Sequence, residues 1–424
     1  MHLCCGNRPP LQTLPLLLTG VLAWVLSTLV SLPALAATAV PVNTASVKTE
    51  SAALNVRIGY LELLQERPPL LSNVLPEPED SGLQGARLGI EDNNAGGRFL
   101  GQHYQLLESR STELAGLLEQ ARQWHDQGIG LLIVNLPAEP LRQLSTLFSA
   151  DEILLFNIGA PDNALRTGPC LSNSLHSLPS RAMLTDALAQ WMASKKLNDW
   201  LLIQGQRPAD MAYAASLRRS ARRFGSRILE TKTWTFDTDL RRSAQTEVPL
   251  FTQGPDYDAL VVADELGDFG EYLLYNSWLP RPVVGTQGLT AVGWHRVVEQ
   301  WGAAQLQSRF QQSAGRWMNG SDYAGWIALR SIGEGIAALN DPDPLRLRQQ
   351  LLSEPFQLAG YLGRKLSYRT WNGQLRRPIP LIHPRALVSQ SPQPGFLHPH
   401  NDLDTLGFDQ AESQCQDLIS GAVR

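Results

Sequence analysis

Carboxylates gather in a few short segments of the chain, and each segment adjoins a predicted strand or helix. The segments hold Glu77, Glu79 and Asp80, then Asp162, and then Asp264 and Glu265. Carboxylates that converge on one cleft favour a cationic ligand, or a hard metal ion that takes oxygen donors. The alternative interpretation is structural, because Asp80 and Asp162 also stand where helix starts need hydrogen-bond acceptors.

A second group of residues, late in the sequence, could bind a metal ion. It consists of His398, His400, Asp402 and Asp404. Imidazoles suit transition metals whereas carboxylates suit hard cations, so the mixture selects neither class of ion. Pro399 disrupts a regular presentation of these side chains, and an ordinary polar tail is the other interpretation.

The sequence carries no motif that indicates an enzyme. It has no Gly-x-x-x-x-Gly-Lys-Ser/Thr phosphate-binding loop, no His-Glu-x-x-His metalloprotease motif and no Gly-x-Ser-x-Gly hydrolase motif. Its histidines are scattered, which is typical of structural or surface residues rather than catalytic bases. We therefore predict a protein without catalytic residues.

The elements that must position these residues begin with a strand and a helix. Residues 56–61 are rich in β-branched and aromatic side chains and predict a strand, whereas the apolar residues of 82–90 follow helical spacing. Asp80 and Ser81 are natural N-cap residues for this helix. The Asn-Asn-Ala-Gly-Gly segment at 93–97 tolerates the left-handed backbone that would end it.

Strands and helices go on alternating after this first unit. Such alternation implies parallel sheets with helices on both faces. Ligands of open α/β sheets bind at the carboxyl ends of the strands, so the loops after each strand are the candidate site. Further strands are predicted at 103–107, 130–134, 153–158, 200–203, 228–234, 259–263 and 282–285, and helices at 114–127, 140–148, 181–195, 212–224, 269–276 and 321–339.

The turn at 93–97 closely resembles the end of the first helix in type I periplasmic solute-binding proteins of the Leu/Ile/Val-binding class. More narrowly, residues 67–73, 76–80 and 403–409 resemble the solute-binding proteins of ABC transporters associated with PQQ-dependent alcohol dehydrogenase systems. The resemblance implies an α/β fold of two doubly wound parallel-sheet lobes joined by a hinge. It further implies a periplasmic component that captures a small ligand between the lobes and works with permease and ATPase subunits.

The resemblance also indicates where a ligand would bind, and where this chain departs from the family. The family holds amino-acid ligands with small hydroxyl residues and backbone amides after the third and fourth strands. The matching loops here contain Asn135 and Pro137, and then Gly159, Ala160 and Asp162, so the hydroxyl pattern is missing.

Arg207 stands near the position where the second lobe of the family often carries a Tyr-Gly pair. These departures argue against an ordinary branched-chain amino acid. Because the related alcohol oxidation systems use calcium or lanthanide ions, such an ion is a further possible ligand. A sensor or interaction module on the same scaffold, without transport, is the alternative function.

The first 36 residues have the layout of a secretory signal, with Arg8, an apolar run and an Ala-Leu-Ala cleavage site at 34–36. We expect a signal peptide at 1–36 and a linker at 37–53, hence a periplasmic protein without stable membrane insertion after cleavage. Cleavage leaves Cys170 and Cys415, which could form one disulfide or remain two thiols.

Composition agrees with a two-lobed globular protein. The chain has 424 residues, of which 43% are hydrophobic, and a net charge of −4 that gives no footprint of nucleic-acid binding. A local basic run, Arg218, Arg219, Arg222 and Arg223, has the spacing of a solvated helix face. We expect lobe 1 at 54–170 and 288–355, lobe 2 at 171–287 and 356–388, and a C-terminal extension at 389–424 that lies against the lobes.

Overall fold

The computed structural model describes residues 53–66, 76–235, 244–415 and 418. The predicted signal peptide and nearly all of the predicted linker lie outside these residues. Within the described part of the chain, no helix combines the length and the apolar character that a membrane span requires.

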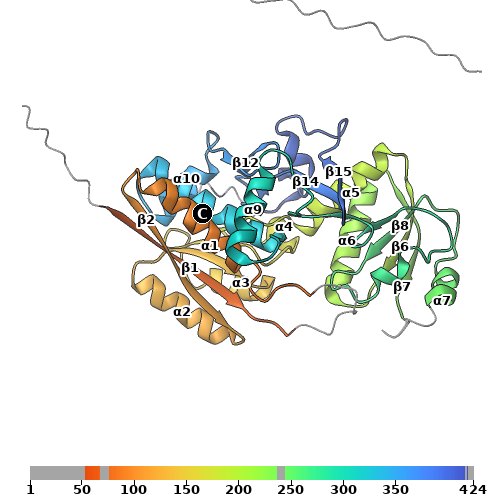
Figure 1. Cartoon of the computed structure of the whole chain (residues 1–424), viewed down its shortest axis with the longest axis horizontal. Coiled ribbons are helices and arrows are strands. Elements are labelled where there is room, and N and C mark those ends of the chain that lie inside the picture. Colours follow the sequence, from red (N-terminus) through yellow and green to blue (C-terminus); the bar gives the residue numbers. More distant parts are fainter. Residues whose placement is uncertain (1–52, 67–75, 236–243, 416–417, 419–424) are drawn as a thin grey trace, which may run out of the picture. The chain divides into compact units, whose positions relative to one another are not determined.

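Lobe 1 is built on a five-stranded parallel sheet with the strand order β2-β1-β3-β4-β5 (Figure 1). The central strands are runs of branched apolar residues that are buried on both faces, as parallel sheets require. The strands are β1 (Leu54–Leu63), β2 (Gln102–Ser111), β3 (Leu131–Asn135), β4 (Leu154–Asn157) and β5 (Ser174–His176).

Helices cover both faces of this sheet, so lobe 1 is doubly wound. One face packs against α1 (Leu83–Gly97), α9 (Ala303–Ala314), α10 (Gly320–Leu339) and α11 (Pro344–Leu352). The other face packs against α2 (Leu114–Asp126) and α3 (Ala138–Ser145). A short helix, α4 (Ala164–Thr167), follows β4.

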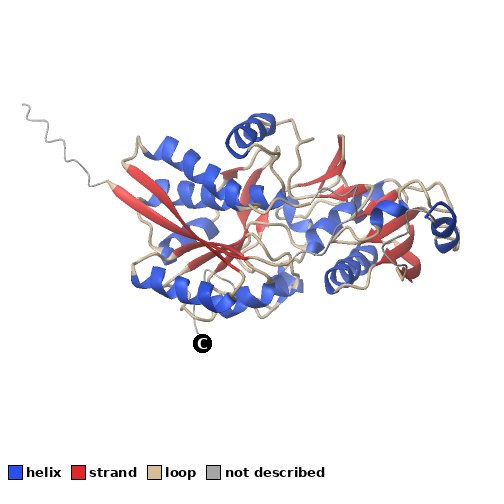
Figure 2. Cartoon of the chain, turned by 60° about the horizontal axis from the view of Figure 1, so that its bottom comes forward, coloured by secondary structure: helices blue, strands red, loops and turns tan. Residues whose placement is uncertain are grey.

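Lobe 2 is built on a seven-stranded sheet with the order β15-β14-β10-β9-β8-β6-β7. Helices α5 (Arg181–Ser194) and α6 (Pro208–Arg223) pack on one face, and α7 (Ala244–Phe251) and α8 (Gly270–Leu273) on the other (Figure 2). The strands are β6 (Asp199–Gln204), β7 (Arg227–Thr233), β8 (Ala259–Ala263), β9 (Val283–Gly285), β10 (Leu289–Ala291), β14 (Ile379–His383) and β15 (Ala386–Ser391).

A small three-stranded sheet extends lobe 1 where the chain crosses between the lobes. It contains β11 (Leu358–Ala359), β12 (Lys365–Tyr368) and β13 (Leu375–Arg376). The antiparallel β12–β13 pair encloses an Asn-Gly turn, Asn372-Gly373, with Gly373 at φ 65°. Gln374 forms a parallel bridge to His176 of β5, and apolar residues of this small sheet join the core of lobe 1.

The structure divides the chain differently from the predicted lobe boundaries. β10, predicted to begin the return to lobe 1, pairs with β9 in the sheet of lobe 2. Residues 358–376, predicted for lobe 2, pack into the lobe 1 core, and β15 runs past the predicted end of lobe 2 at residue 388. The predicted helix at 269–276 is only the single turn α8.

The predicted caps of the first helix are also wrong. Gly82, not Asp80 or Ser81, stands at the N-cap of α1, and its N–H donates to Asp322 Oδ1 of α10 at 2.9 Å. Helix α1 continues in right-handed backbone to Gly97. Asn94 instead ties the helix to β2, because its side chain both accepts from and donates to the backbone of Tyr104.

Small residues let α1 and α10 approach closely. A Cβ at Gly85 would lie 1.8 Å from the backbone oxygen of Asp322, and a Cβ at Gly325 would lie 2.4 Å from that of Gly82. No side chain fits at these distances without moving one helix. The helix pair therefore depends on glycine at both positions.

We predict that Gly85→Ala lowers the free energy of unfolding by about 1–3 kcal/mol or more, because the added methyl group must displace α10. Gly96→Ala, in the same helix but with open space around the added Cβ, should stabilise the protein by about 0.5–1 kcal/mol. Urea unfolding followed by circular dichroism measures both. An equal effect of the two substitutions would contradict the packing described here.

Candidate functional site

The loop after β4 in lobe 1 and the loop after β8 in lobe 2 meet at Arg181, the first residue of α5. Its Nε and Nη2 donate to Glu265 at 2.8 Å each, and its Nη1 lies 3.0 Å from Asp162 Oδ1. The Arg181 side chain is only 9% exposed. We call these residues the clasp, since Asp162 belongs to lobe 1 while Arg181 and Glu265 belong to lobe 2.

The clasp gives the predicted acidic residues Asp162 and Glu265 a specific partner. Burial disfavours the charged form of Arg181, but the bonds to Glu265 and Asp162 outweigh it and raise the pKa of the guanidinium. The two carboxylates do converge between the lobes. They converge on a cation that the protein itself supplies.

A cavity of about 590 Å³ lies beside the clasp and is lined by residues of both lobes. Its walls are largely apolar, with Ile158 and Pro161 from lobe 1 and Leu184 from lobe 2. The groups that can form hydrogen bonds there include Glu77, His295, Asn319 and Ser321. The remaining lining residues are Pro76, Pro78, Leu178, Pro179, Gly293 and Gly320.

The surroundings of two polar residues in this cavity affect what they can bind. Burial, together with the charge of Arg296, lowers the pKa of His295, so its imidazole is neutral at pH 7. Asn319 caps α10 by accepting from the Asp322 N–H at 2.9 Å, and its Nδ2 donates to Ser81 Oγ at 2.8 Å. The cavity is therefore an open, largely apolar hollow with a few polar groups in its lining.

The predicted ligand residues after β3 and β4 make contacts within the protein or stand at a helix start. The N–H groups of Gly159 and Ala160 donate to Asn157 Oδ1 at 3.1 and 2.9 Å. Asn135 Nδ2 donates to Glu62 Oε1 at 3.1 Å. Pro137 stands at the N-cap of α3. Among the described residues that line the cavity, none of these four occurs.

The predicted acidic residues at 79–80 do not line the cavity either. Asp80 accepts from Gln84 and Arg316 at 2.9 Å each, and these bonds lower the pKa of Asp80 despite its partial burial. The backbone oxygen of Glu79 accepts from Arg110. From this acidic loop, it is Glu77 that reaches the cavity. The acidic residues of this loop indicated a candidate binding site in the sequence, but its composition did not distinguish Glu77 from Glu79.

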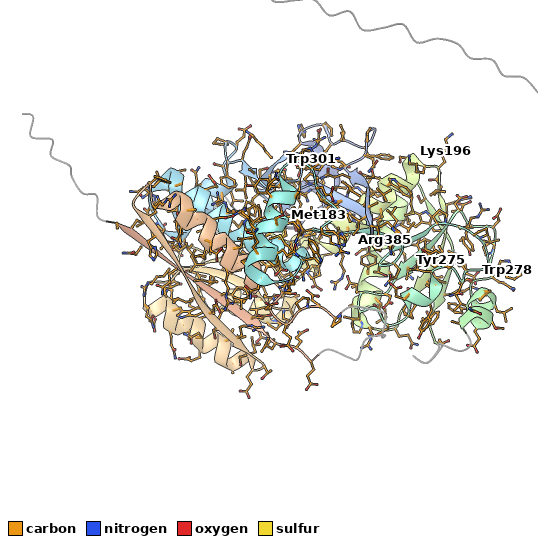
Figure 3. The ribbon with its side chains drawn as sticks, in the orientation of Figure 1. Met183, Lys196, Tyr275, Trp278, Trp301 and Arg385 are labelled. Carbon is orange, nitrogen blue, oxygen red and sulfur yellow. A yellow bond between two sulfur atoms is a disulfide. The ribbon has the colours of Figure 1, made fainter. Side chains whose placement is uncertain are left out.

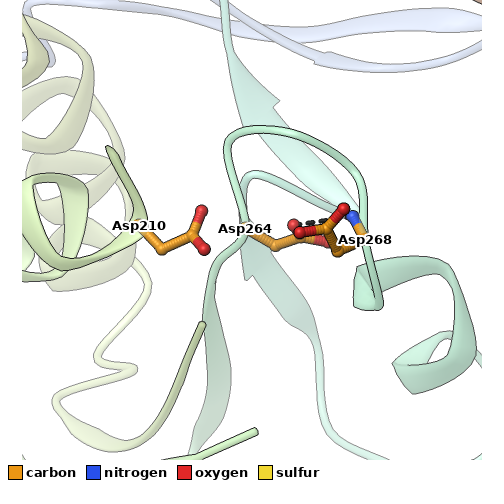
Figure 4. A group of neighbouring side chains, drawn as sticks. All are labelled: Asp210, Asp264 and Asp268. Atoms are coloured by element: carbon orange, nitrogen blue, oxygen red, sulfur yellow. Dashed lines mark hydrogen bonds between the residues drawn. The ribbon is translucent and has the colours of Figure 1, made fainter. Parts of the chain in front are cut away.

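Asp264 lies in an acidic group with Asp210 and Asp268 (Figure 4). Within the described residues this is the one set whose ligand atoms, all within 4.8 Å of one another, could hold a metal ion. Asp264 accepts from the N–H groups of Asp268, Phe269 and Gly270, and so caps α8. Three carboxylates suit a hard cation, but the oxygens of Asp264 already accept hydrogen bonds from backbone N–H groups.

The other members of this acidic group have backbone and side-chain partners as well. Asp210 Oδ1 accepts from the N–H of Glu265 at 2.8 Å, which fixes the loop that carries the clasp. Asp268 pairs with Arg207, another predicted ligand residue. Arg207 is thus engaged in an exposed ion pair and does not line the cavity.

The predicted metal residues of the tail do not converge. Asp404 is buried and pairs with Arg369 and Arg376, whereas Asp402 pairs with Arg364. His398 Nε2 lies 3.3 Å from Asp409 Oδ2, and its Nδ1 accepts from the N–H of His400. Guanidinium groups pair with these carboxylates, and the described structure does not gather the four predicted residues around one point.

Two parallel-sheet lobes, joined by several crossings and enclosing a cavity between them, define the fold of type I periplasmic binding proteins. Residues 75–245 match the family model described as Periplasmic binding protein. No curated protein sequence matches the chain. This part of the chain thus carries the sequence pattern of periplasmic binding proteins.

Several solved structures are similar in fold to this chain. A branched-chain amino acid ABC transporter ligand-binding protein from Burkholderia xenovorans is 16% identical, with TM-score 0.67 over 86% of this chain and 100% of the other. A Desulfitobacterium hafniense substrate-binding protein in complex with Leu is 13% identical, with TM-score 0.59 over 80% and 99%. A Rhodopseudomonas palustris solute-binding protein in complex with 3,4-dihydroxybenzoic acid is 10% identical, with TM-score 0.57 over 77% and 92%.

We predict that Arg181→Gln costs about 2–3 kcal/mol of stability, because it leaves two partly buried carboxylates without their cation. Arg207→Gln removes a far more exposed guanidinium from its pair with Asp268 and should cost less than about 1 kcal/mol. Denaturant unfolding of the two variants gives the comparison. Similar losses would show that the clasp contributes no more than a surface ion pair.

A second prediction concerns Asp210, whose pKa burial and the neighbouring Asp264 raise from 3.8 to about 6. The folded protein binds this proton more tightly than the unfolded chain, so the stabilisation is complete below about pH 3.8 and lost as the pH rises through about 6. Asp210→Asn should therefore show a smaller fall in Tm than the wild type between about pH 5 and pH 7.

The matched control for this pH experiment is Asp126→Asn, since the Asp126 side chain is 81% exposed. Its Tm should follow the wild-type pH dependence. If Asp210→Asn also follows the wild type, Asp210 does not titrate in this range.

Proposed function

We propose that the protein is the periplasmic substrate-binding component of an ABC importer, which captures a small ligand between its lobes. The observation that carries the proposal is the largely apolar cavity between the lobes of a type I periplasmic binding protein fold. Hinge closure around a ligand needs no catalytic group. Two solved proteins that share this fold, one in complex with Leu and one in complex with 3,4-dihydroxybenzoic acid, support capture of a small organic molecule.

The proposed ligand is neutral or cationic with an apolar body, not a simple carboxylate. Among the described lining residues there is no lysine or arginine, and Glu77 contributes a negative charge. Arg181, beside the cavity, already binds two carboxylates. The N–H groups of Gly159 and Ala160, which could otherwise hold a carboxylate, are bonded to Asn157.

We further propose that the protein works alongside PQQ-dependent alcohol oxidation. This part rests on the sequence segments 67–73, 76–80 and 403–409 alone. It makes alcohol-derived compounds, PQQ-related compounds, and calcium or lanthanide ions candidates for the cargo. The acidic group of Asp210, Asp264 and Asp268 is where such an ion would find oxygen donors.

A thermal-shift screen of the exported, purified protein tests the proposal. The panel contains aliphatic and aromatic alcohols, amines, leucine, benzoate, PQQ, calcium and lanthanum. We expect a neutral or cationic organic compound to raise the Tm, because a ligand of the native state stabilises it. If no member of the panel raises the Tm at concentrations well above plausible affinities, the solute-binding function is contradicted.

The residue-level test uses the acidic loop. For a cationic ligand, Glu77→Gln should weaken binding in calorimetry by about tenfold, whereas Glu79→Gln, in the same loop but outside the cavity lining, should leave it unchanged. A tenfold change corresponds to about 1.4 kcal/mol, a typical value for one charge-assisted hydrogen bond. If the two variants behave alike, or if only carboxylates bind, the proposed ligand class is wrong.

A further inference from the structure

The C-terminal segment is not a simple extension of lobe 2. Residues 402–415, which we call the strap, contact both lobes in alternation. Leu406 is fully buried in the core of lobe 2, whereas Cys415 is joined to Cys170 on the lobe 1 side by a disulfide with 5.2 Å between the Cα atoms. Beyond the strap, Leu418 packs in the lobe 1 core.

The strap first meets the β12–β13 hairpin, which belongs to lobe 1. Asp404 Oδ1 accepts from Arg369 Nε at 2.7 Å and from Arg376 Nε at 2.8 Å. Arg369 Nη2 also donates to the backbone oxygens of Leu403 and Leu406. Because Arg369 and Asp404 are nearly inaccessible to water, separating them would leave buried charges without partners.

Three residues after Asp404, at Gly407, the strap is fixed to lobe 2. The N–H of Gly407 donates to Asp186 Oδ2 at 2.9 Å, and its oxygen accepts from Arg219 and Arg223 of α6. Gly407 is in left-handed backbone at φ 85°, and a Cβ there would lie 2.8 Å from Cγ of Met183 (Figure 3).

Part of the basic run of α6 therefore has a role that the sequence did not reveal. Arg219 and Arg223 were predicted to lie on a solvated helix face. Both instead bind the buried Asp186 together with Glu412 of the strap. The guanidinium of Arg219 also covers the Phe408 ring at 4.1 Å.

The strap then returns to lobe 1 with almost no slack. Glu412 accepts from Arg219 of lobe 2, while the next residue, Ser413, donates to the backbone oxygen of Arg166 in α4. Gln414 N donates to Thr167 O at 2.7 Å. Adjacent Cα atoms are about 3.8 Å apart, so the two lobes cannot separate here unless contacts on one side break.

We propose that the strap is a covalently anchored brace between the lobes, which limits how far the ligand-free protein opens. The strap is fastened to both lobes, by the disulfide on lobe 1 and by Asp186, Arg219 and Arg223 on lobe 2. The inference rests on the proposed function in one respect, because it takes the lobes to move as those of a binding protein do.

The test measures the distance between the lobes in ligand-free protein. Spin labels are placed through a non-cysteine amino acid at two exposed positions next to the cleft edges, Glu139 at the start of α3 and Met211 near the start of α6. The variants are Cys170→Ser with Cys415→Ser, and Cys170→Ser in a chain that ends after Glu412. We expect both distance distributions to broaden and to shift by several ångströms toward longer distances.

The control is a chain that ends after Leu418, which keeps the strap and should give the wild-type distribution. If a variant fails to fold, a thiol reductant added to labelled wild type opens the disulfide in the folded protein. Unchanged distances in the folded variants and after reduction overturn the inference. The distance measurement needs no ligand, so its outcome is independent of the thermal-shift screen. A failure of the strap proposal can therefore be told from a failure of the proposed function.

Discussion

The guanidinium of Arg181 is a cation buried between two sheets, and it is tolerated there only if carboxylates from both lobes reach it. Much of the surrounding structure holds those carboxylates in place. Asn157 and Arg166 bind the loop that carries Asp162, through the N–H and oxygen of Ala160 among other contacts. Asp210 binds the N–H of Glu265 on the other side.

The need of Arg181 for carboxylate partners explains the positions of several acidic residues between the lobes. The carboxylates of Asp210 and Asp264 organise the loops after β6 and β8, and those loops present Glu265 to Arg181. Several carboxylates of the cleft are engaged in this way. The cavity beside them is lined by an apolar wall, by Glu77, which accepts from Asn319 and Ser321, and by His295, whose pKa is lowered by burial.

The sequence predicted the layered fold well because its signals are local. Buried runs such as 131–134 and 259–263 can only be central strands, and helical spacing between them requires helices on both faces. The start of α1 was mispredicted because Asp80 and Ser81 look like caps in isolation. The acceptor for Gly82 is Asp322, which is 240 residues away, and no local pattern reports such a partner. The pairing of β14 with β10 within the lobe 2 sheet, across the predicted lobe boundary, was missed for the same reason.

The site was predicted in outline only. The strand-end loops do meet between the lobes, yet which oxygen or N–H remains available depends on side chains such as Asn157 and Arg316 that arrive from elsewhere. His295 and Asn319 were not predicted as site residues, because the segments that carry them follow no family motif in this sequence.

The disulfide has a consequence for the order in which the molecule can be assembled. Cys170 and Cys415 are separated by 245 residues, so Cys170 is synthesised, and in an exported chain translocated, long before its partner. The intervening chain supplies every strand and helix of lobe 2 and the late helices of lobe 1. The two cysteines can therefore reach their native distance, and be oxidised to this disulfide, only after both lobes have been made and have come together.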